Sequence, residues 1–373
     1  MRIRELIFNN FRAFRGETRI SFVDPLTDAV QPVTVIAGTN GSGKTTILDT
    51  IEALLAYALD QDKPQELIME AQRRSLICLT LELDPAELGQ TGDAQMFVDS
   101  ESQLLRIAVG EWELLPDDIK AEQHCLFGWL VDKDNFDKTG RPRKLHLFPG
   151  QKLADNLRET VSMMEQDQVK FQGGLLYFPH DRRLGKTNSG PTIEQPPKER
   201  RWLFRFSPYD QWQGSLEQLW VWQNYLDLEQ SAEGRKNLKP FVELVENILG
   251  AGRKITIKEG RVSVTPSWDI SNDTLNRVRL DQLPSGEQQC LLLFGELARR
   301  RRQGVVITLD EPEISLHPTL QRKLVHRLRQ LARGLDGQLI LATHSLEILR
   351  AVHESERVIL DQLEEPALVY EEA

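Results

Sequence analysis

The sequence predicts an α/β fold in which helices cover a largely parallel sheet. Three short apolar runs carry this prediction, because each has the length of a buried strand and leads into a helical pattern. They are residues 33–37, 305–309 and 338–342. Of the 373 residues, 40% are hydrophobic and 27% are charged, which is an ordinary balance for a globular protein with a sizeable core.

Alternating apolar and polar residues predict a second sheet beside this core. The alternation occurs at residues 2–8 and 17–23, and again at 75–83 and 104–109. Such alternation is typical of strands with one covered face, so we expect a mixed sheet core accompanied by an antiparallel β subdomain.

The alternation of predicted strands and helices stops at about residue 110 and resumes after residue 281. We therefore expect an α/β core split between residues 1–109 and 282–373, with an inserted, largely helical lobe at residues 110–281. A stretch rich in Gly, Pro, Ser and Thr near 185–201 predicts a mobile loop. Inside the lobe we expect a strand at 175–179, helices at 208–230 and 238–249, and a hairpin at 254–265 with its turn at Glu259-Gly260. After the lobe we expect helices at 285–302, 318–333 and 345–352, and strands at 357–360 and 367–370.

Charge and cysteine content exclude several classes of protein. The net charge of −10 argues against bulk electrostatic binding to nucleic acid or membrane, although a local basic groove stays open. No segment reaches the roughly 20 apolar residues needed to cross a bilayer, and the start of the chain lacks the apolar centre of a signal peptide. The three cysteines, Cys78, Cys125 and Cys290, have no metal or redox spacing. We expect a reduced, cytoplasmic protein that does not bind membranes.

The first apolar run turns through glycines into Lys-Thr-Thr, which predicts a phosphate-binding loop. Residues 38–45 fit the pattern G-x-x-x-x-G-K-[ST] at every fixed position. Glycines let backbone N–H groups surround an anion, and the following helix offers its positive end to the same anion. Lys44 is expected to reach the terminal phosphates of ATP as a catalytic residue, and Thr45 to ligate Mg²⁺. The residues expected to bind ATP in this phosphate loop are Gly38, Asn40, Gly41, Ser42, Gly43, Lys44, Thr45 and Thr46.

Two acids follow the second apolar run, where a parallel sheet carries its ligand site. Asp310 is expected to complete the Mg²⁺ shell, and Glu311 to orient and activate the attacking water. Taken alone, an Asp-Glu pair after a strand fits a helix cap equally well. Together with the phosphate loop, it indicates a nucleotide site.

Three more tracts resemble motifs of the ABC-type ATPases. Residues 283–289 resemble the signature motif, residues 310–318 the magnesium-binding strand end with its D-loop, and residues 343–345 the switch histidine. Residues 10–14 resemble the Asn-Phe-Arg-x-Phe start of the members that act on DNA, which include the RecF, SMC and OLD groups. Since order and spacing agree along the chain, it is similar to an ABC-type P-loop ATPase head.

The resemblance implies an active site shared between two subunits. In this family, two heads close head-to-tail around two ATP molecules, and the signature motif of one head contacts the γ-phosphate held by the other. Here Ser285, Gly286 and Glu287 would take the signature role, and His344 would contact the γ-phosphate as a catalytic residue. His317, beside Pro318, is expected to shape the turn.

One expected element departs from the family pattern. Transporter-type members complete the magnesium shell with a glutamine, and the stretch at residues 177–182 has His180 at the corresponding place. Either His180 or Asp181 substitutes for the glutamine, or the two stretches do not correspond.

The layout narrows the choice of relatives. The ATPase subunit of a transporter is excluded for two reasons. The distance from Lys44 to Ser285 is 241 residues, and Glu287 stands where the signature motif of transporters usually has a second glycine. The absence of a sustained heptad pattern excludes a long SMC arm. The tracts look most like arm-less ATPases found beside nuclease or other effector proteins in bacterial defence. We expect a homodimer that serves as an ATP-gated switch for an effector partner; the alternative is a RecF-like DNA repair ATPase.

Basic and aromatic groups leave DNA binding open. Residues 299–302 are all arginine and would neutralise the end of the signature helix or contact DNA. Tryptophans at helical spacing in residues 208–230 would stack on bases or pack into a core. The remaining basic residues flank the expected mobile loop, as a binding surface or as a solvated face: Arg182, Arg183, Lys186, Lys198, Arg200, Arg201 and Arg205.

Overall fold

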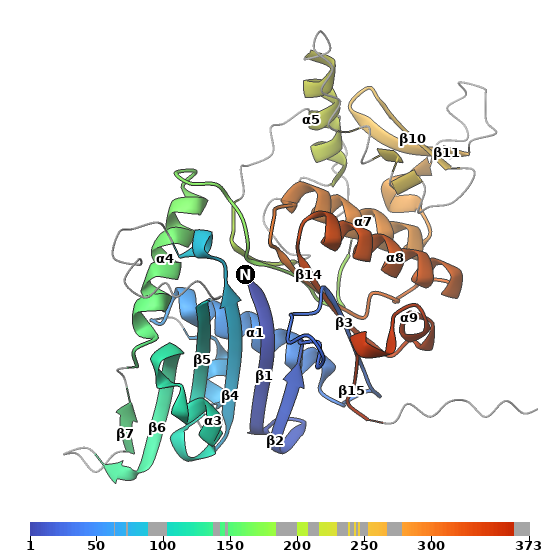
Figure 1. The fold of residues 1–373 in the computed structure, drawn as a ribbon. Helices are drawn as coiled ribbons and strands as arrows, with labels where there is room; N and C mark the ends of the chain where they lie inside the picture. The colour runs from blue at the N-terminus through green and yellow to red at the C-terminus, as the bar shows by residue number, and fades with distance from the viewer. Residues whose placement is uncertain are drawn as a thin grey trace, which may run out of the picture.

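Two six-stranded sheets with a helix between them form the body of the protein (Figure 1). The computed structural model describes residues 1–62, 64–71, 74–88, 103–136, 142–145, 148–183, 200–207, 216–229, 238, 242–243, 245–246, 253–266 and 278–361. The second predicted helix of the lobe falls mostly outside these ranges, as do most of the predicted mobile loop, Trp212 and the strand predicted at 367–370.

The sheet that carries the phosphate loop is parallel throughout its described strands. Its order is β15 (Arg357–Ile359), β3 (Val33–Ala37), β14 (Gln338–Thr343), β13 (Val306–Asp310), β8 (Leu175–Phe178) and β9 (Leu203–Arg205). The three central strands lie within one residue of the apolar runs that predicted them. Their carboxyl ends meet at one edge, where the predicted acids and the phosphate loop also lie.

The second sheet is the predicted β subdomain. Its order is β2 (Phe14–Ser21), β1 (Arg2–Phe11), β4 (Leu76–Leu83), β5 (Gln103–Glu111), β6 (Leu126–Phe136) and β7 (Pro142–Leu145). Its neighbours pair antiparallel except β5 and β6, which are parallel. The sheet is therefore mixed, and it is larger than the sequence indicated because β6 and β7 were not predicted.

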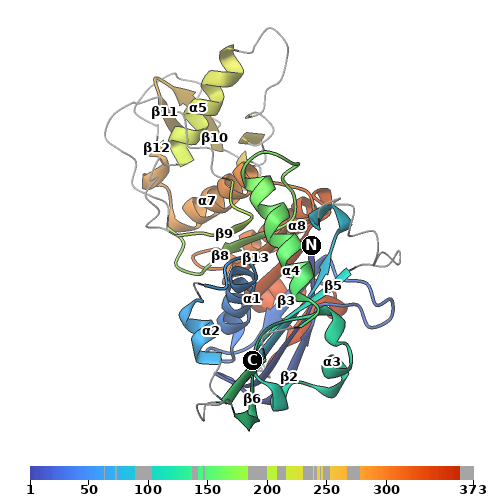
Figure 2. The same ribbon diagram turned by 90° about the vertical axis from the view of Figure 1, so that its left-hand side faces the viewer.

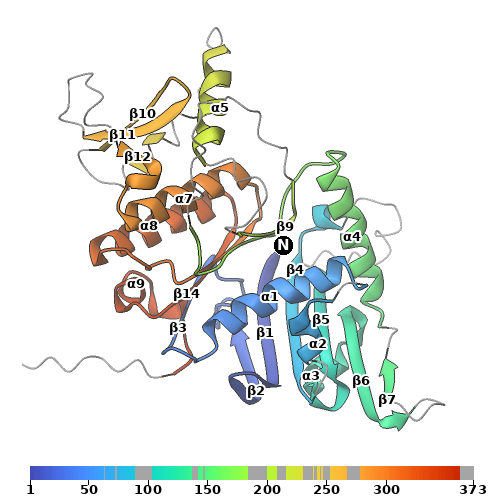
Figure 3. The same ribbon diagram turned by 180° about the vertical axis from the view of Figure 1, so that it is seen from behind.

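Helix α1 (Lys44–Leu59), which begins at the phosphate loop, lies between the two sheets (Figure 3). Leu48 and Ile51 of α1 join one buried cluster with Ile340 of β14 and Leu79 of β4. Because side chains alternate across a strand, Leu341 of β14 belongs to the cluster on the opposite face. Replacing a fully buried leucine such as Leu48 with Ala is expected to cost about 2–5 kcal/mol of unfolding free energy.

The other helices cover the outer faces. Three helices cover the face of the parallel sheet that is opposite α1: α7 (Ser285–Arg300), α8 (Pro318–Gly334) and α9 (Leu346–Arg350). Helix α4 (Gln151–Glu165) lies beside α1 (Figure 2). The short helices α2 (Glu66–Ala71) and α3 (Asp117–Ala121) complete the described helices of this body. Among the described residues, every helix is too short or too polar to span a bilayer.

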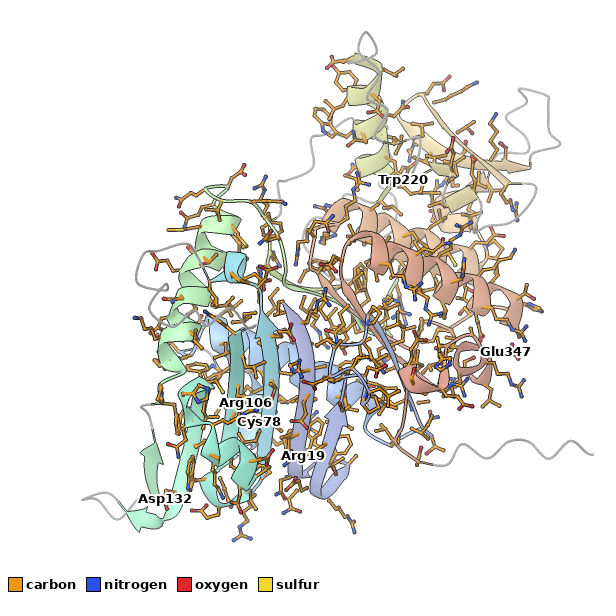
Figure 4. The ribbon with its side chains drawn as sticks, in the orientation of Figure 1. Arg19, Cys78, Arg106, Asp132, Trp220 and Glu347 are labelled. Atoms are coloured by element: carbon orange, nitrogen blue, oxygen red, sulfur yellow. The ribbon has the colours of Figure 1, made fainter. Side chains whose placement is uncertain are left out.

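The part of the predicted lobe that the described residues after β9 form lies over α7 (Figure 1). It contains α5 (Leu216–Glu229) and a three-stranded sheet of β10 (Arg253–Lys258), β11 (Arg261–Pro266) and β12 (Val278–Arg279). The predicted turn is confirmed at Glu259 and Gly260, which both have positive φ, the backbone of a two-residue hairpin loop. Trp220 is 1% exposed at the base of α5, which supports packing for this tryptophan (Figure 4).

The division of the chain into a core and an inserted lobe at residues 110 and 281 stays a proposal. The strand order of the two large sheets limits where such a lobe can begin. Strands β6 to β9 fall inside that range and yet belong to the two large sheets. Of the described elements in the range, only α5 and the strands β10 to β12 lie outside both large sheets and their helix layers. A separate lobe is therefore restricted to the residues after β9, and its described part mixes helix and strand.

Candidate nucleotide site

The phosphate loop joins the end of β3 to the start of α1. Gly43 has a φ of 102°, and a Cβ atom there would lie 2.6 Å from the ring of Phe14. Glycine is therefore required both by the backbone conformation and by the close approach of the turn between β1 and β2. This contact also brings the turn between β1 and β2, in the second sheet, against the phosphate loop.

Lys44 is held over the loop that precedes it. Its side chain is 5% exposed, and Nζ donates hydrogen bonds to the carbonyl oxygens of Gly38 at 2.8 Å and Thr39 at 2.7 Å. Asn40 and Gly41, at the tip of the loop, are exposed. An ammonium group beside an exposed loop that leads into the amino end of a helix is an arrangement that suits phosphate binding.

Asp310 lies directly opposite the first turn of α1. The hydroxyl of Thr45 donates to Oδ2 of Asp310 at 2.8 Å, and Nδ1 of His180 lies 3.5 Å from the same oxygen. The structure thus brings His180, rather than Asp181, to the predicted magnesium ligands. Burial raises the pKa of Asp310, while the Thr45 hydrogen bond opposes this shift.

These residues fit a magnesium ion that also binds phosphate. Oδ1 of Asp310 is buried and has no hydrogen-bond partner among the described residues, so an oxygen ligand is left over. The described residues contain no group of three or more His, Cys, Asp or Glu side chains that could hold a metal alone. Mg²⁺ is commonly bound by one or two protein oxygens together with substrate phosphates, and Thr45 and Asp310 supply such a partial set.

Glu311 has a strained backbone that its neighbours hold in place. Its φ is 46°, in the left-handed region that a residue with a side chain rarely adopts. Its N–H donates to the carbonyl of Ala342 at 2.8 Å, and its own carbonyl accepts from Arg182 at 3.0 Å. The side chain stays partly exposed at the edge of the sheet, where a water-activating carboxylate would need to be.

Arg182 is buried at the centre of this edge and is not part of a surface. It is 3% exposed, and its guanidinium donates to the carbonyl oxygens of Phe178, Pro179, Asp310 and Glu311. Burial lowers its pKa. The expectation that Arg182 belongs to a DNA or partner surface is therefore wrong, because four backbone acceptors converge on it.

The imidazole ring of His344, which follows β14, lies near two carboxylates. Its Nδ1 lies 3.6 Å from Oε1 of Glu311 and 3.4 Å from Oε1 of Glu313. The next residue, Ser345, caps α9 by accepting a hydrogen bond from the N–H of Ile348. The cap is thus supplied by Ser345, and the half-exposed ring of His344 is left to serve the site. His317 shapes its turn as expected, since it caps α8 through Thr319.

The signature residues lie at the start of α7. Ser285 is exposed at the first position of α7, and Glu287 accepts a hydrogen bond from Arg253 at 3.1 Å. A Cβ atom on Gly286 would lie 2.5 Å from the carbonyl oxygen of Ser315, so the signature glycine packs on the D-loop. Among the described residues, no hydrogen bond or ion pair joins Ser285 or its two successors to the phosphate loop of the same chain.

Sequence reasoning missed further contacts around the site. Gln289 of α7 donates to the carbonyl of Arg182 at 2.7 Å, which ties the signature helix to the acids. Asp361 accepts from both the N–H and the hydroxyl of Thr39 in the phosphate loop. The position of Arg182 just after β8, at the ligand edge of a parallel sheet, was the one signal in the sequence for its role.

The arginine tract at residues 299–302 is largely packed into the protein. Arg302 is 6% exposed and donates to the carbonyl oxygens of Gly173 and Trp202. Arg300 pairs with Glu296 and lies over the ring of Phe204. At least these two arginines therefore stabilise the core sheet from the end of α7, and neither is available as a DNA contact.

Two family profiles match the chain. The profile described as AAA domain, putative AbiEii toxin, Type IV TA system, matches residues 185–350, and a second AAA-domain profile matches residues 5–94. The second match contains the phosphate loop, and the first contains the acids, the signature residues and the switch histidine. No curated protein matches the chain.

Solved SMC heads resemble the chain at low identity. An SMC head bound to the C-winged helix domain of ScpA shares 14% identity with a TM-score of 0.47, and the SMC head domain from Thermotoga maritima shares 15% with a TM-score of 0.43. An SMC head with an extended coiled coil, bound to the C-terminal domain of ScpA derived from Pyrococcus furiosus, shares 12% with a TM-score of 0.46. Each comparison covers 94% of this chain and 92% of the other. The two AAA-domain matches together contain the phosphate loop, the paired acids and the switch histidine, so over these residues the chain is similar to AAA-domain ATPases.

Proposed function

We propose that the protein binds ATP with Mg²⁺, hydrolyses it, and closes head-to-tail with a second copy while ATP is bound. The observation that carries this proposal is the hydrogen bond from Thr45 to Asp310, which joins the phosphate loop to the acidic strand end. Lys44 precedes Thr45 at the start of α1, Glu311 follows Asp310 at the end of β13, and His344, which follows β14, lies beside Glu311. The residues of a phosphoryl-transfer site thus share one edge of the sheet.

Each side chain has a role that its position supports. Lys44 would leave its two carbonyl partners to neutralise the terminal phosphates. Thr45 and Asp310 would hold Mg²⁺, with His180 beside them, and the ion would offset phosphate charge as the bond to the leaving group breaks. Glu311 would orient the attacking water, and His344 would contact the γ-phosphate next to it.

The signature residues support a shared active site. Ser285 is exposed at the amino end of a long helix, where free N–H groups and the helix dipole favour an anion. Its own phosphate loop lies elsewhere in the same chain. The γ-phosphate held by a second copy is the anion that this arrangement would serve, and the backbone N–H groups of Gly286 and Glu287 would complete the contact.

We further propose that this ATP-dependent closure controls an effector protein in bacterial defence. The support is the profile match over residues 185–350, whose description names a toxin of a toxin–antitoxin system. A RecF-like role on DNA is the alternative, and the burial of Arg182 and Arg302 removes two of the basic residues that it would use.

Mass measurement with and without ATP tests the proposal. The Glu311→Gln variant should bind ATP, hydrolyse it at least about 100-fold more slowly, and accumulate as a dimer only with ATP and Mg²⁺. A Lys44→Ala, Glu311→Gln double variant should stay monomeric under the same conditions. Unchanged mass with ATP bound would contradict the shared site. ATP-dependent, salt-sensitive retention of DNA on filters would favour the RecF-like alternative.

A further inference from the structure

The carboxylate of Glu313 lies buried at the carboxyl end of β14. Its side chain is 4% exposed. Oε1 accepts hydrogen bonds from the hydroxyl of Thr343 at 2.6 Å and from the N–H of His344 at 2.9 Å. These two donors come from consecutive residues, so the carboxylate is fixed directly against the backbone that carries the histidine.

Glu313 is also close to the imidazole ring. Its Oε1 lies 3.4 Å from Nδ1 of His344, on the same side of the ring as Oε1 of Glu311. An ionised carboxylate can only accept a hydrogen bond, so two carboxylates near one ring nitrogen favour a proton on that nitrogen. With the proton on Nδ1, the other nitrogen, Nε2, is the one left to meet a substrate.

The turn that carries Glu313 is itself firmly closed. The N–H of Leu316 donates to the carbonyl of Glu313 at 2.9 Å, and the N–H of Ile314 donates to that of Glu311 at 3.3 Å. Oε2 of Glu313 is buried and has no hydrogen-bond partner among the described residues. The Nδ1 atom of His344, 3.4 Å from Oε1, is a further polar group beside this carboxylate.

We infer that Glu313 is a positioning residue for ATP hydrolysis, which fixes the ring orientation and the tautomer of His344 beside Glu311. Glu313 is too deeply buried to contact a nucleotide, so it acts through the histidine. The inference rests on the proposed function, because it assigns His344 to the hydrolytic site. It adds a carboxylate–histidine pair that the acidic tract alone does not reveal.

The test compares Glu313→Gln with Glu347→Gln. Glutamine keeps an oxygen for Thr343 and for the N–H of His344, but it removes the charge and offers an amide that can donate to Nδ1. We expect kcat to fall about 10–100-fold while KM for ATP changes by less than about twofold. Glu347 of α9 pairs with Arg322 and Arg350 outside the cluster, and its variant should hydrolyse ATP at the parent rate (Figure 4).

Nitrogen-15 NMR of histidine-labelled protein gives a second, independent readout. His344→Gln identifies the signals of His344 in the parent protein, and we expect Nδ1 to carry a proton there. In Glu313→Gln the proton should move toward Nε2. A parent protein with Nδ1 unprotonated overturns the inference even if no variant of Glu313 folds, and so does a Glu313→Gln protein with the parent kcat. A parent protein that hydrolyses no ATP would instead refute the proposed function, and the NMR result would still decide whether Glu313 sets the tautomer.

Discussion

The hydroxyl of Thr45 donates to the carboxylate of Asp310 at 2.8 Å although 265 residues separate them in sequence. The bond joins the first turn of α1 to the end of β13, two elements that pack against each other in the centre of the fold. A chain that has not brought these segments together has no site. Folding of the parallel sheet and formation of the nucleotide site are therefore one event.

Lys44→Ala should abolish ATP binding. The substitution removes the one ammonium group that the phosphate loop holds against its own carbonyl oxygens, and with it the charge that balances the terminal phosphates. We expect affinity for ATP to fall at least about 100-fold in isothermal titration calorimetry, a loss of at least about 2.7 kcal/mol. Lys323→Ala on the exposed face of α8 is the matched control and should bind like the parent. Normal ATP affinity in the Lys44 variant would refute the phosphate-loop assignment.

Asp310→Asn should stabilise the ligand-free protein. The carboxylate is fully buried and one of its oxygens has no hydrogen-bond partner among the described residues, whereas Asn still accepts from Thr45. We expect the free energy of unfolding in urea to rise by about 1 kcal/mol at neutral pH. ATP and Mg²⁺ together should stabilise the parent more than the variant, because Asn is a weaker ligand for the ion.

The stability that Asp310→Asn gains should depend on pH in a defined direction. Burial raises the pKa of Asp310, so the folded protein binds the proton at a higher pH than the unfolded chain does. The protonated form is the one the fold favours, and stability is lost as the pH rises through the folded pKa. The advantage of Asn should therefore be largest near neutral pH and shrink as the pH falls. Asp181→Asn, on an exposed neighbour of His180, should stay within about 0.5 kcal/mol of the parent. An Asp310→Asn protein that is less stable than the parent at neutral pH would contradict the expectation.

Arg182→Met should cost both stability and activity. Methionine fills similar space but removes the guanidinium that four carbonyl oxygens share, which we expect to cost about 3 kcal/mol in urea unfolding. Two of these carbonyls belong to Asp310 and Glu311, so kcat should fall in protein that remains folded. The adjacent Arg183 is exposed, and Arg183→Ala should leave both quantities unchanged. Equal effects of the two substitutions would show that the buried contacts of Arg182 contribute neither to stability nor to activity.

The sequence could predict the strands that position the site but not the side chains that hold it together. Strands β3, β13 and β14 are buried on both faces, so each appears as an uninterrupted apolar run that ends at a turn. Arg182 was assigned to a surface because a basic residue beside a loop is usually solvated. Only the tertiary fold shows that β8 and β13 run parallel and deliver four carbonyl oxygens to it.

Two other features were beyond the reach of sequence patterns. Glu313 was not singled out, because its partners Thr343 and His344 lie about 30 residues further along the chain. Strand β6 was missed because its outer half is polar and glycine interrupts its apolar half, which removes both a continuous run and a clean alternation. The contacts of Glu313 and the strand pairing of β6 join residues that are distant in sequence, and local sequence patterns do not record such contacts.

A mixing experiment should decide whether one active site needs two chains. Lys44→Ala has no functional phosphate loop but keeps its signature residues, whereas Ser285→Arg keeps the loop and places a bulky cation where the γ-phosphate of another subunit would lie. Each variant alone should hydrolyse almost no ATP. An equimolar mixture should recover a measurable part of the parent rate, because each mixed dimer holds one intact site of two. Mixing Lys44→Ala with Glu311→Gln, which damages the same half of the site, should recover nothing, since both sites of every mixed dimer then have a damaged loop or a damaged acid. Recovery in both mixtures, or in neither, would exclude the head-to-tail arrangement.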